Sequence, residues 1–276
     1  MLAQFLNPPN WFTGASLFCS TYAMSLLIGQ PEPSTATLVR ACVLVVFGGV
    51  FDLLDGRVAR LTRRQSEFGV QLDSIADIVG FGVAPAMIAW TWKLHELGAV
   101  GVAVAFWYLL CAAFRLARFN VAAAIPKEGP GAWPFPGHSQ GLTSTMSGGA
   151  LVTTVWVANG FLAEGLVDPA RVSPAVFAVF VAALGYLMIS SIPFRTFRDM
   201  RQSAYAKRLF AVTMSACLTS AIVLDVSMLF GMGTILYLSL GLVDGIGTAW
   251  LHRRLGQALL VGDDPLDADG EPADTE

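Results

Sequence analysis

The chain has 276 residues, of which 55% are hydrophobic and 13% charged, with a net charge of −3 and a mean hydropathy of +0.61. These values exclude an ordinary soluble enzyme, because several apolar runs are long enough to cross about 30 Å of hydrocarbon. We expect residues 1–255 to form one all-α, polytopic integral membrane domain. Its expected surroundings are membrane lipids, and we expect no nucleic-acid partner.

In chain order, about eight transmembrane helices are predicted. The apolar spans are about 11–29, 36–56, 70–92, 98–117, 143–163, 172–192, 207–225 and 230–250. Residues 256–276 form an acidic tail with seven carboxylates and no base after residue 262, so we expect the tail to be disordered. The rest of the chain is mildly basic, which suits anionic lipids and nucleotides.

The basic residues predict the orientation of these spans. Of the 17 Lys and Arg residues, 14 fall on one side when the spans alternate, and Arg40, Lys93 and Arg171 fall on the other. Cytoplasmic loops of membrane proteins carry the excess of Lys and Arg. We therefore expect a multi-pass protein of the cytoplasmic (inner) membrane, with both termini on the cytoplasmic side.

Four carboxylates lie at the cytoplasmic edge of the second and third spans, where an unpaired charge is costly and therefore usually functional. Asp52 and Asp55 share one helical face, and Asp73 and Asp77 share a face of the next helix. If these faces oppose each other in a hairpin, they create an all-oxygen site suited to magnesium, calcium or manganese. The alternative is a membrane-edge hairpin with solvated acids and a basic loop.

Small residues accompany the acids. Gly56 and Ala59 lie on the same face as Asp52 and Asp55 and leave room for a flat group, such as a nucleotide, to approach the helix. Arg60 would then face a phosphate.

Together these residues resemble the signature of the CDP-alcohol phosphatidyltransferase family. The pattern is Asp52-x2-Asp55-Gly56-x2-Ala59-Arg60-x8-Gly69-x3-Asp73-x3-Asp77. The resemblance implies displacement of CMP from a CDP-linked lipid, CDP-diacylglycerol, by a small alcohol. It also implies two divalent cations, Mg²⁺ or Mn²⁺, on the four aspartates, Asp77 as the general base, and a homodimer.

The resemblance further implies residues that bind the CDP-lipid. Arg60 and Ser66 match nucleotide-contact positions of the family. Asn10 lies in a Pro-x-Asn-x-x-Thr segment that similar enzymes place near the nucleotide; alternatively, Asn10 and Thr13 cap the first span.

Two further segments look like those of the phosphatidylserine synthases within the family, namely Phe114–Asn120 and residues 189–198. They imply an acceptor site that includes Arg115, Arg118 and Asn120. Arginine suits a phosphate or a serine carboxylate, although both arginines could instead extend to the membrane interface.

One segment departs from the pattern of the serine synthases. It reads Phe135-Pro-Gly-His-Ser-Gln-Gly141, which makes His138 and Gln140 candidates for an altered acceptor contact. We expect L-serine as the acceptor, giving phosphatidylserine and CMP; glycerol 3-phosphate, inositol phosphate and choline are the alternatives. A cation-coupled transporter is a remote alternative. It predicts acids near the middle of the membrane and inverted repeats, whereas the acids of this sequence lie toward the cytoplasmic edge and no repeat is visible.

Overall fold

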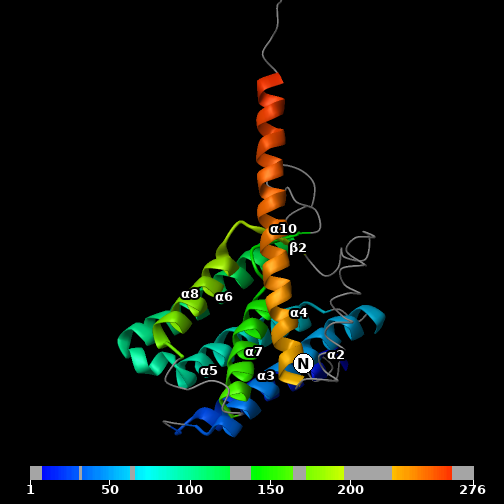
Figure 1. The fold of residues 1–276 in the computed structure, drawn as a ribbon. Helices are drawn as coiled ribbons and strands as arrows, with labels where there is room; N and C mark the ends of the chain where they lie inside the picture. Colours follow the sequence, from blue (N-terminus) through cyan, green and yellow to red (C-terminus); the bar gives the residue numbers. More distant parts are fainter. Residues whose placement is uncertain are drawn as a thin grey trace, which may run out of the picture.

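The computed structural model describes residues 8–30, 33–62, 66–124, 138–163, 172–195 and 226–262, and this part of the chain is mostly helical (Figure 1). The helices, in chain order, are α2 (Pro8–Leu27), α3 (Thr35–Thr62), α4 (Glu67–Asp77), the π-helix η1 (Ile78–Val83), α5 (Ala84–Trp92), the 3₁₀-helix η2 (Leu94–Leu97), α6 (Ala99–Ala124), α7 (Ser144–Ala163), α8 (Pro174–Ile189) and α10 (Val226–Gly262).

Three helical segments among the described residues are long and apolar enough to cross a membrane. They are Thr35–Val58, Glu67–Trp92 and Ala99–Ala122, with Pro174–Ile189 as a shorter apolar helix. The structure therefore has the helical character of a membrane protein, but it does not establish eight crossings. The expected span at 207–225 lies outside the described residues.

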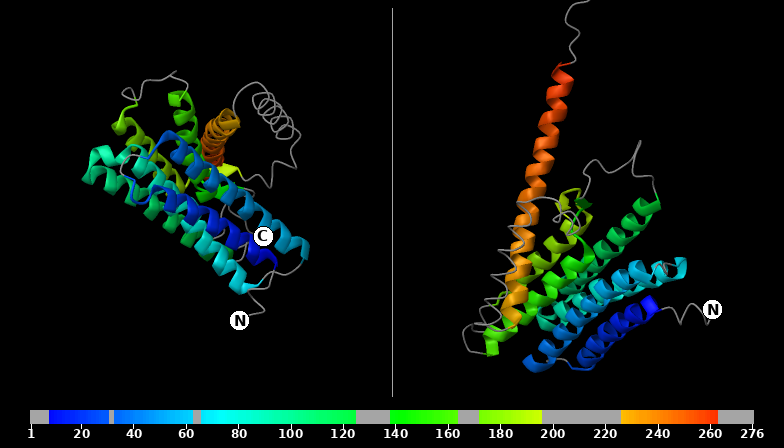
Figure 2. Two further views of the ribbon diagram at one scale, coloured as in Figure 1. Left: turned by 90° about the horizontal axis from the view of Figure 1, so that it is seen from below. Right: turned by 90° about the vertical axis from the view of Figure 1, so that its right-hand side faces the viewer.

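The helices pack side by side around α5 and α7 (Figure 2). Helices α2 and α3 form an antiparallel hairpin whose turn contains Gly29 at φ 78°. Helix α5 contacts α2, α3, α6 and α7, and its Ala84, Ile88 and Ala89 have no exposed surface. The small side chains of Ala84 and Ala89 allow close helix contacts, as is usual in membrane bundles.

A π-helical turn separates the carboxylates of α4 from this core. Pro85, at the start of α5, has no N–H to donate to the carbonyl of Phe81, four residues earlier. The hydroxyl of Tyr108 on α6 donates to that carbonyl at 3.0 Å, and Tyr108 is completely buried. A side chain of a neighbouring helix thus satisfies the carbonyl, as expected at a proline inside an apolar bundle.

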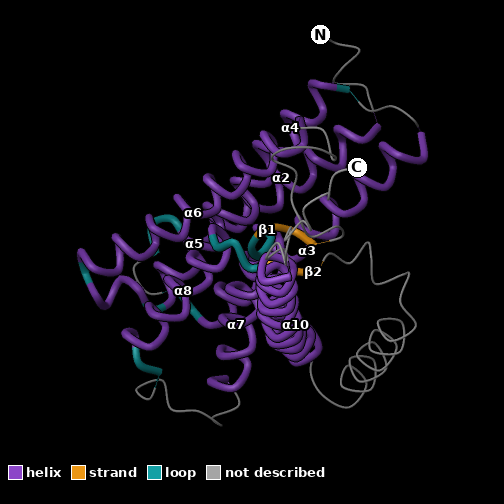
Figure 3. Tube along the Cα trace, turned by 90° about the horizontal axis from the view of Figure 1, so that it is seen from above, coloured by secondary structure: helices purple, strands orange, loops and turns teal. Residues whose placement is uncertain are grey.

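Two short strands depart from the all-α expectation. The strands β1 (His138–Gln140) and β2 (Pro193–Arg195) pair antiparallel, with Ser139 opposite Phe194. Figure 3 shows them beside the axis of α10. The strands join the beginning of α7 to the end of α8, so they fix two chain segments that are far apart in sequence.

Helix α10 packs against α7 and β2 through small residues. A Cβ atom at Gly241 would lie 3.0 Å from the Phe194 ring, and one at Gly245 would lie 2.5 Å from the carbonyl oxygen of Pro193. The helix continues to Gly262 and extends beyond the other helices (Figures 1 and 2). Residues 256–262 are therefore helical, because the apolar run continues up to the first acid of the tail; residues 263–276 lie outside the described part.

Candidate functional site

The structure brings the predicted aspartates together. Single carboxylate oxygens of Asp52, Asp55 and Asp73 all lie within 4.8 Å of one another, and Asp55 is only 6% exposed. The carboxyl group of Asp77 lies close to that of Asp52. Carboxylates this close repel one another unless a proton or a cation lies between them.

The donor set fits a hard divalent cation. Every candidate ligand is a carboxylate oxygen, which magnesium, manganese and calcium prefer. The Oδ1 atoms of Asp73 and Asp77 are buried and have no hydrogen-bond partner among the described residues. A cation between α3 and α4 would supply the partner that these buried oxygens require.

Helix α2 forms a third wall of the site. Thr13 is buried, and its hydroxyl donates to Oδ2 of Asp55 at 2.8 Å. Asn10, 8% exposed, lies inside α2 rather than at its cap, and a Cβ atom at Gly69 would come within 3.1 Å of its Oδ1. The Pro-x-Asn-x-x-Thr segment therefore lies against both aspartate-bearing helices.

The other residues expected to bind the CDP-lipid differ in their surroundings. Gly56 adjoins open space, because a Cβ atom there would meet nothing within 4 Å. The hydroxyl of Ser66 caps α4 by accepting from the Gly69 N–H at 3.0 Å. Ala59 and Arg60 are helical in backbone, and their side chains lie outside the described part.

Arg115 lies at the inner edge of this cluster. It is 8% exposed, and its Nη1 donates to the hydroxyl of Ser144 at 3.0 Å. The guanidinium carbon stands 5.3 Å from the centre of the Phe119 ring. Arg115 is within electrostatic range of Asp77, yet no ion pair within 4.0 Å joins the two described side chains.

Arg118 binds the protein backbone instead. Its Nη1 donates to the carbonyl of Ile189 at 3.0 Å, and its Nη2 donates to the carbonyls of Gln140 at 2.6 Å and Met188 at 3.0 Å. Arg118 thus ties α6 to β1 and to the end of α8. Asn120 is exposed and donates to the Ser74 hydroxyl at 3.1 Å, which links α6 to α4.

The divergent segment contributes His138 and Gln140 to β1. The His138 Nε2 lies 3.6 Å from Oδ2 of Asp244 on α10, an ion pair when the imidazole is protonated. Gln140 contributes its carbonyl to Arg118, as described above. The lone acid at 244 therefore has a neighbour that its position in the sequence did not reveal.

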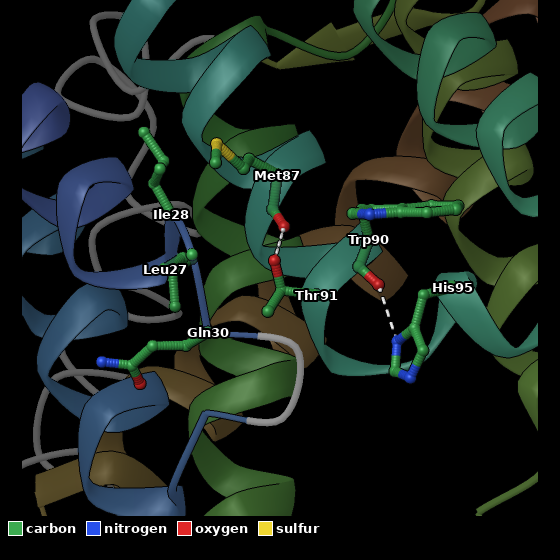
Figure 4. A pocket seen from close by; sticks show the side chains of 8 residues that line it. Leu27, Ile28, Gln30, Met87, Trp90, Thr91 and His95 are labelled. Carbon is green, nitrogen blue, oxygen red and sulfur yellow. Dashed lines mark hydrogen bonds between the residues drawn. The ribbon is translucent and has the colours of Figure 1, made fainter.

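A separate cavity of about 490 Å³ lies where α2 and α5 end (Figure 4). Thr13 lies near the other end of α2, and Asp73 lies on α4, which precedes α5 in the chain. Its lining contains no carboxylate: Leu27, Ile28, Gly29, Gln30, Met87, Trp90, Thr91 and His95. Two of its polar side chains are engaged locally, since Thr91 donates to the Met87 carbonyl at 2.8 Å and His95 lies 3.1 Å from the Trp90 carbonyl. This cavity does not adjoin the aspartates.

Sequence reasoning did not assign three residues to the site, namely Thr13, Ser144 and Tyr237. Thr13 is recognisable as part of the Pro-x-Asn-x-x-Thr segment. Ser144 of α7 bonds Arg115, and Tyr237 of α10 lies within electrostatic range of it. Neither residue carries a local sequence signal, because its role depends on how distant helices pack.

Comparisons with known proteins identify the family of the chain. The family model "CDP-alcohol phosphatidyltransferase" matches residues 6–243. A "CDP-diacylglycerol--serine O-phosphatidyltransferase" of Helicobacter pylori is 34% identical over 201 residues, covering 71% of this chain and 76% of that protein. Proteins of the same name match from Bacillus subtilis, at 32% identity over 58% of this chain and 77% of the relative, and from Saccharomyces cerevisiae, at 40% over 46% and 44%. The chain belongs to the CDP-alcohol phosphatidyltransferase family.

Proposed function

We propose that this protein transfers a phosphatidyl group from CDP-diacylglycerol to the hydroxyl of L-serine, giving phosphatidylserine and CMP. The observation that carries the proposal is the convergence of Asp52, Asp55 and Asp73, with Asp77 against Asp52. The name and coverage of the Helicobacter pylori relative support serine as the acceptor.

In the reaction, the serine oxygen attacks the phosphorus that carries the diacylglycerol, and the bond from this phosphorus to the oxygen of CMP breaks. Asp52, Asp55, Asp73 and Asp77 would hold divalent Mg²⁺ or Mn²⁺, two per site, which neutralises charge on the diphosphate and on the leaving oxygen. Asp77 accepts the proton of the serine hydroxyl, and Thr13 orients the Asp55 carboxylate through its hydrogen bond.

The remaining residues divide between the two substrates. Asn10, Gly56, Ala59, Arg60 and Ser66 bind the CDP-lipid, and the open space at Gly56 supports this assignment. The acceptor-binding residues are Arg115, Arg118, Asn120, His138 and Gln140. Since the Arg118 guanidinium already binds three carbonyls, its contribution is to hold β1 in place, while Arg115 is the better candidate for direct contact.

The proposal includes the arrangement in the membrane. The apolar runs support eight crossings, and the distribution of Lys and Arg supports a cytoplasmic position at the inner membrane for both termini and the aspartates. CDP-diacylglycerol would enter sideways from the lipid and serine from the aqueous side. A homodimer, with residues 1–255 as the membrane domain of each copy, is part of the same proposal.

Release of CMP from CDP-diacylglycerol by the purified protein tests the reaction. Serine, glycerol 3-phosphate, inositol phosphate and choline are offered separately with Mg²⁺ or Mn²⁺. We expect release with serine; release with another alcohol would move the acceptor assignment, and silence with all four would refute the proposed activity. Asp77→Asn should abolish release and leave the helical content unchanged, whereas near-normal turnover by this variant would exclude Asp77 as the required base.

A further inference from the structure

Arg115 is held in a preformed cradle built by three helices. Ser144 of α7 accepts its hydrogen bond at 3.0 Å, Phe119 of α6 lies 5.3 Å from its guanidinium carbon, and the Tyr237 phenol of α10 is within electrostatic range. Arginine has five N–H donors, and the described residues accept one of them. The cradle therefore fixes the guanidinium while leaving donors for a ligand.

Thr143, rather than Ser144, caps the start of α7. The hydroxyl of Thr143 caps this helix by accepting from the Met146 N–H at 3.3 Å, and the Thr143 carbonyl accepts from the Ser147 N–H at 2.9 Å. The Ser144 side chain, 3% exposed, is thus available to accept from Arg115. A buried hydroxyl aligned in this way restricts the rotation of the arginine.

The segment that leads to Ser144 is itself tightly placed. Gly141 has φ 75°, and a Cβ atom there would come within 2.5 Å of the Met188 carbonyl oxygen and 3.0 Å of Nη2 of Arg118. Its N–H donates to the Ile192 carbonyl at 2.9 Å. Residues 138–141, the described part of the segment that departs from the pattern of the serine synthases, therefore pack against Arg118 just before Ser144, which bonds Arg115.

Arg115 and Asp77 are neighbours that do not pair directly. The two groups interact electrostatically but do not form an ion pair within 4.0 Å in the described structure. An acceptor with its hydroxyl at Asp77 would direct a carboxylate on the neighbouring carbon toward Arg115. A guanidinium matches a carboxylate with two parallel hydrogen bonds.

We infer that Ser144, with Phe119 and Tyr237, positions the Arg115 guanidinium to receive the carboxylate of the acceptor. This inference rests on the proposed function and extends it, because it identifies positioning residues that determine acceptor specificity. Ser144 and Tyr237 act through Arg115 and do not contact the reacting atoms.

Steady-state kinetics of Ser144→Ala test the inference. Loss of the hydrogen bond should raise the KM for serine about five- to tenfold. The value of kcat and the KM for CDP-diacylglycerol should stay within about twofold of the wild type. Ser144→Thr keeps a hydroxyl and should restore the KM for serine, and Tyr237→Phe provides a second variant with an effect in the same direction.

Competition experiments separate the carboxylate from the rest of the acceptor. In Ser144→Ala, 3-hydroxypropionate, which has the hydroxyl and the carboxylate, should inhibit serine turnover five- to tenfold more weakly than in the wild type. Inhibition by ethanolamine, which lacks the carboxylate, should not change. Ser239→Ala is the matched control, since the Ser239 hydroxyl is exposed and bonds only carbonyls of its own helix, Ile235 and Leu236.

Three results would overturn the inference. An unchanged KM for serine in both Ser144→Ala and Tyr237→Phe would exclude the positioning role. A rise in the KM for CDP-diacylglycerol instead would assign Arg115 to the phosphates of the nucleotide-lipid. A parallel fall in kcat and thermal stability, without a change in the KM for serine, would indicate a structural role. A wild type that releases no CMP with serine would refute the proposed function itself, which is a distinguishable failure.

Discussion

Removal of the Tyr108 hydroxyl should destabilise the protein, because it leaves the Phe81 carbonyl without its donor in the core. A buried acceptor without a partner costs about 1–3 kcal/mol, while hydrogen bonds between membrane helices average about 0.6 kcal/mol. Tyr108 is completely buried and its bond is 3.0 Å long, so we expect Tyr108→Phe to lower the free energy of unfolding by about 1–2 kcal/mol.

Pro85 provides the second arm of a double-mutant cycle. Pro85→Ala restores an N–H at the position from which an α-helix would bond the Phe81 carbonyl. In that background, Tyr108→Phe should lower the free energy of unfolding by less than about 0.5 kcal/mol, since the carbonyl has another donor. The coupling between the two substitutions should therefore be about 1 kcal/mol.

Unfolding of the four proteins in mixed micelles, driven by SDS and followed by circular dichroism, measures this coupling. Tyr186→Phe is the matched control, because Tyr186 is 61% exposed on α8 and should tolerate loss of its hydroxyl. Effects of Tyr108→Phe and Pro85→Ala that add within about 0.5 kcal/mol would refute the link between the proline and the tyrosine.

Three further predictions concern the cation site and the packing of α7. Thr13→Val should raise the Mg²⁺ or Mn²⁺ concentration needed for half-maximal CMP release at least about tenfold, because it removes the donor to Asp55. Thr21→Val, which removes an exposed hydroxyl of the same helix, should leave that concentration unchanged. Chelation with EDTA should abolish CMP release, and excess Mg²⁺ or Mn²⁺ should restore it; activity that persists in EDTA would contradict the metal assignment. Gly148→Ala should lower the melting temperature, because its Cβ atom would lie 3.0 Å from backbone atoms of η1, whereas Gly149→Ala meets nothing within 4 Å and should leave the melting temperature unchanged or higher. Equal effects of the two glycine substitutions would contradict the close packing.

The carboxylate cluster was the most predictable part of the structure. Helical spacing alone places Asp52 with Asp55 and Asp73 with Asp77, and long apolar runs make their membrane-edge position costly without a function. The structure brings the two pairs together as that spacing predicted. Apolar runs likewise located α3 and α6, although their exact bounds differ by up to several residues.

Features that depend on distant packing were not predictable. The pairing of β1 with β2 joins residues 138–140 to 193–195, and no local pattern of three residues specifies it. The same holds for His138 beside Asp244, which lie on β1 and α10, far apart in the sequence. The sequence could indicate that Arg115 and Arg118 were both substrate candidates, but only the packing of α8 and β1 shows that Arg118 is occupied by backbone carbonyls.

The docking of α10 on β2 has a consequence for biosynthesis. The aspartates lie on α3 and α4, so their cluster can assemble while the ribosome is still translating the later helices. Tyr237 comes within electrostatic range of Arg115 only after α10 has been synthesised and has packed against β2 through Gly241 and Gly245. A nascent chain would therefore complete the proposed cation site before the proposed acceptor site, and a product that ends before α10 should retain the first without the second.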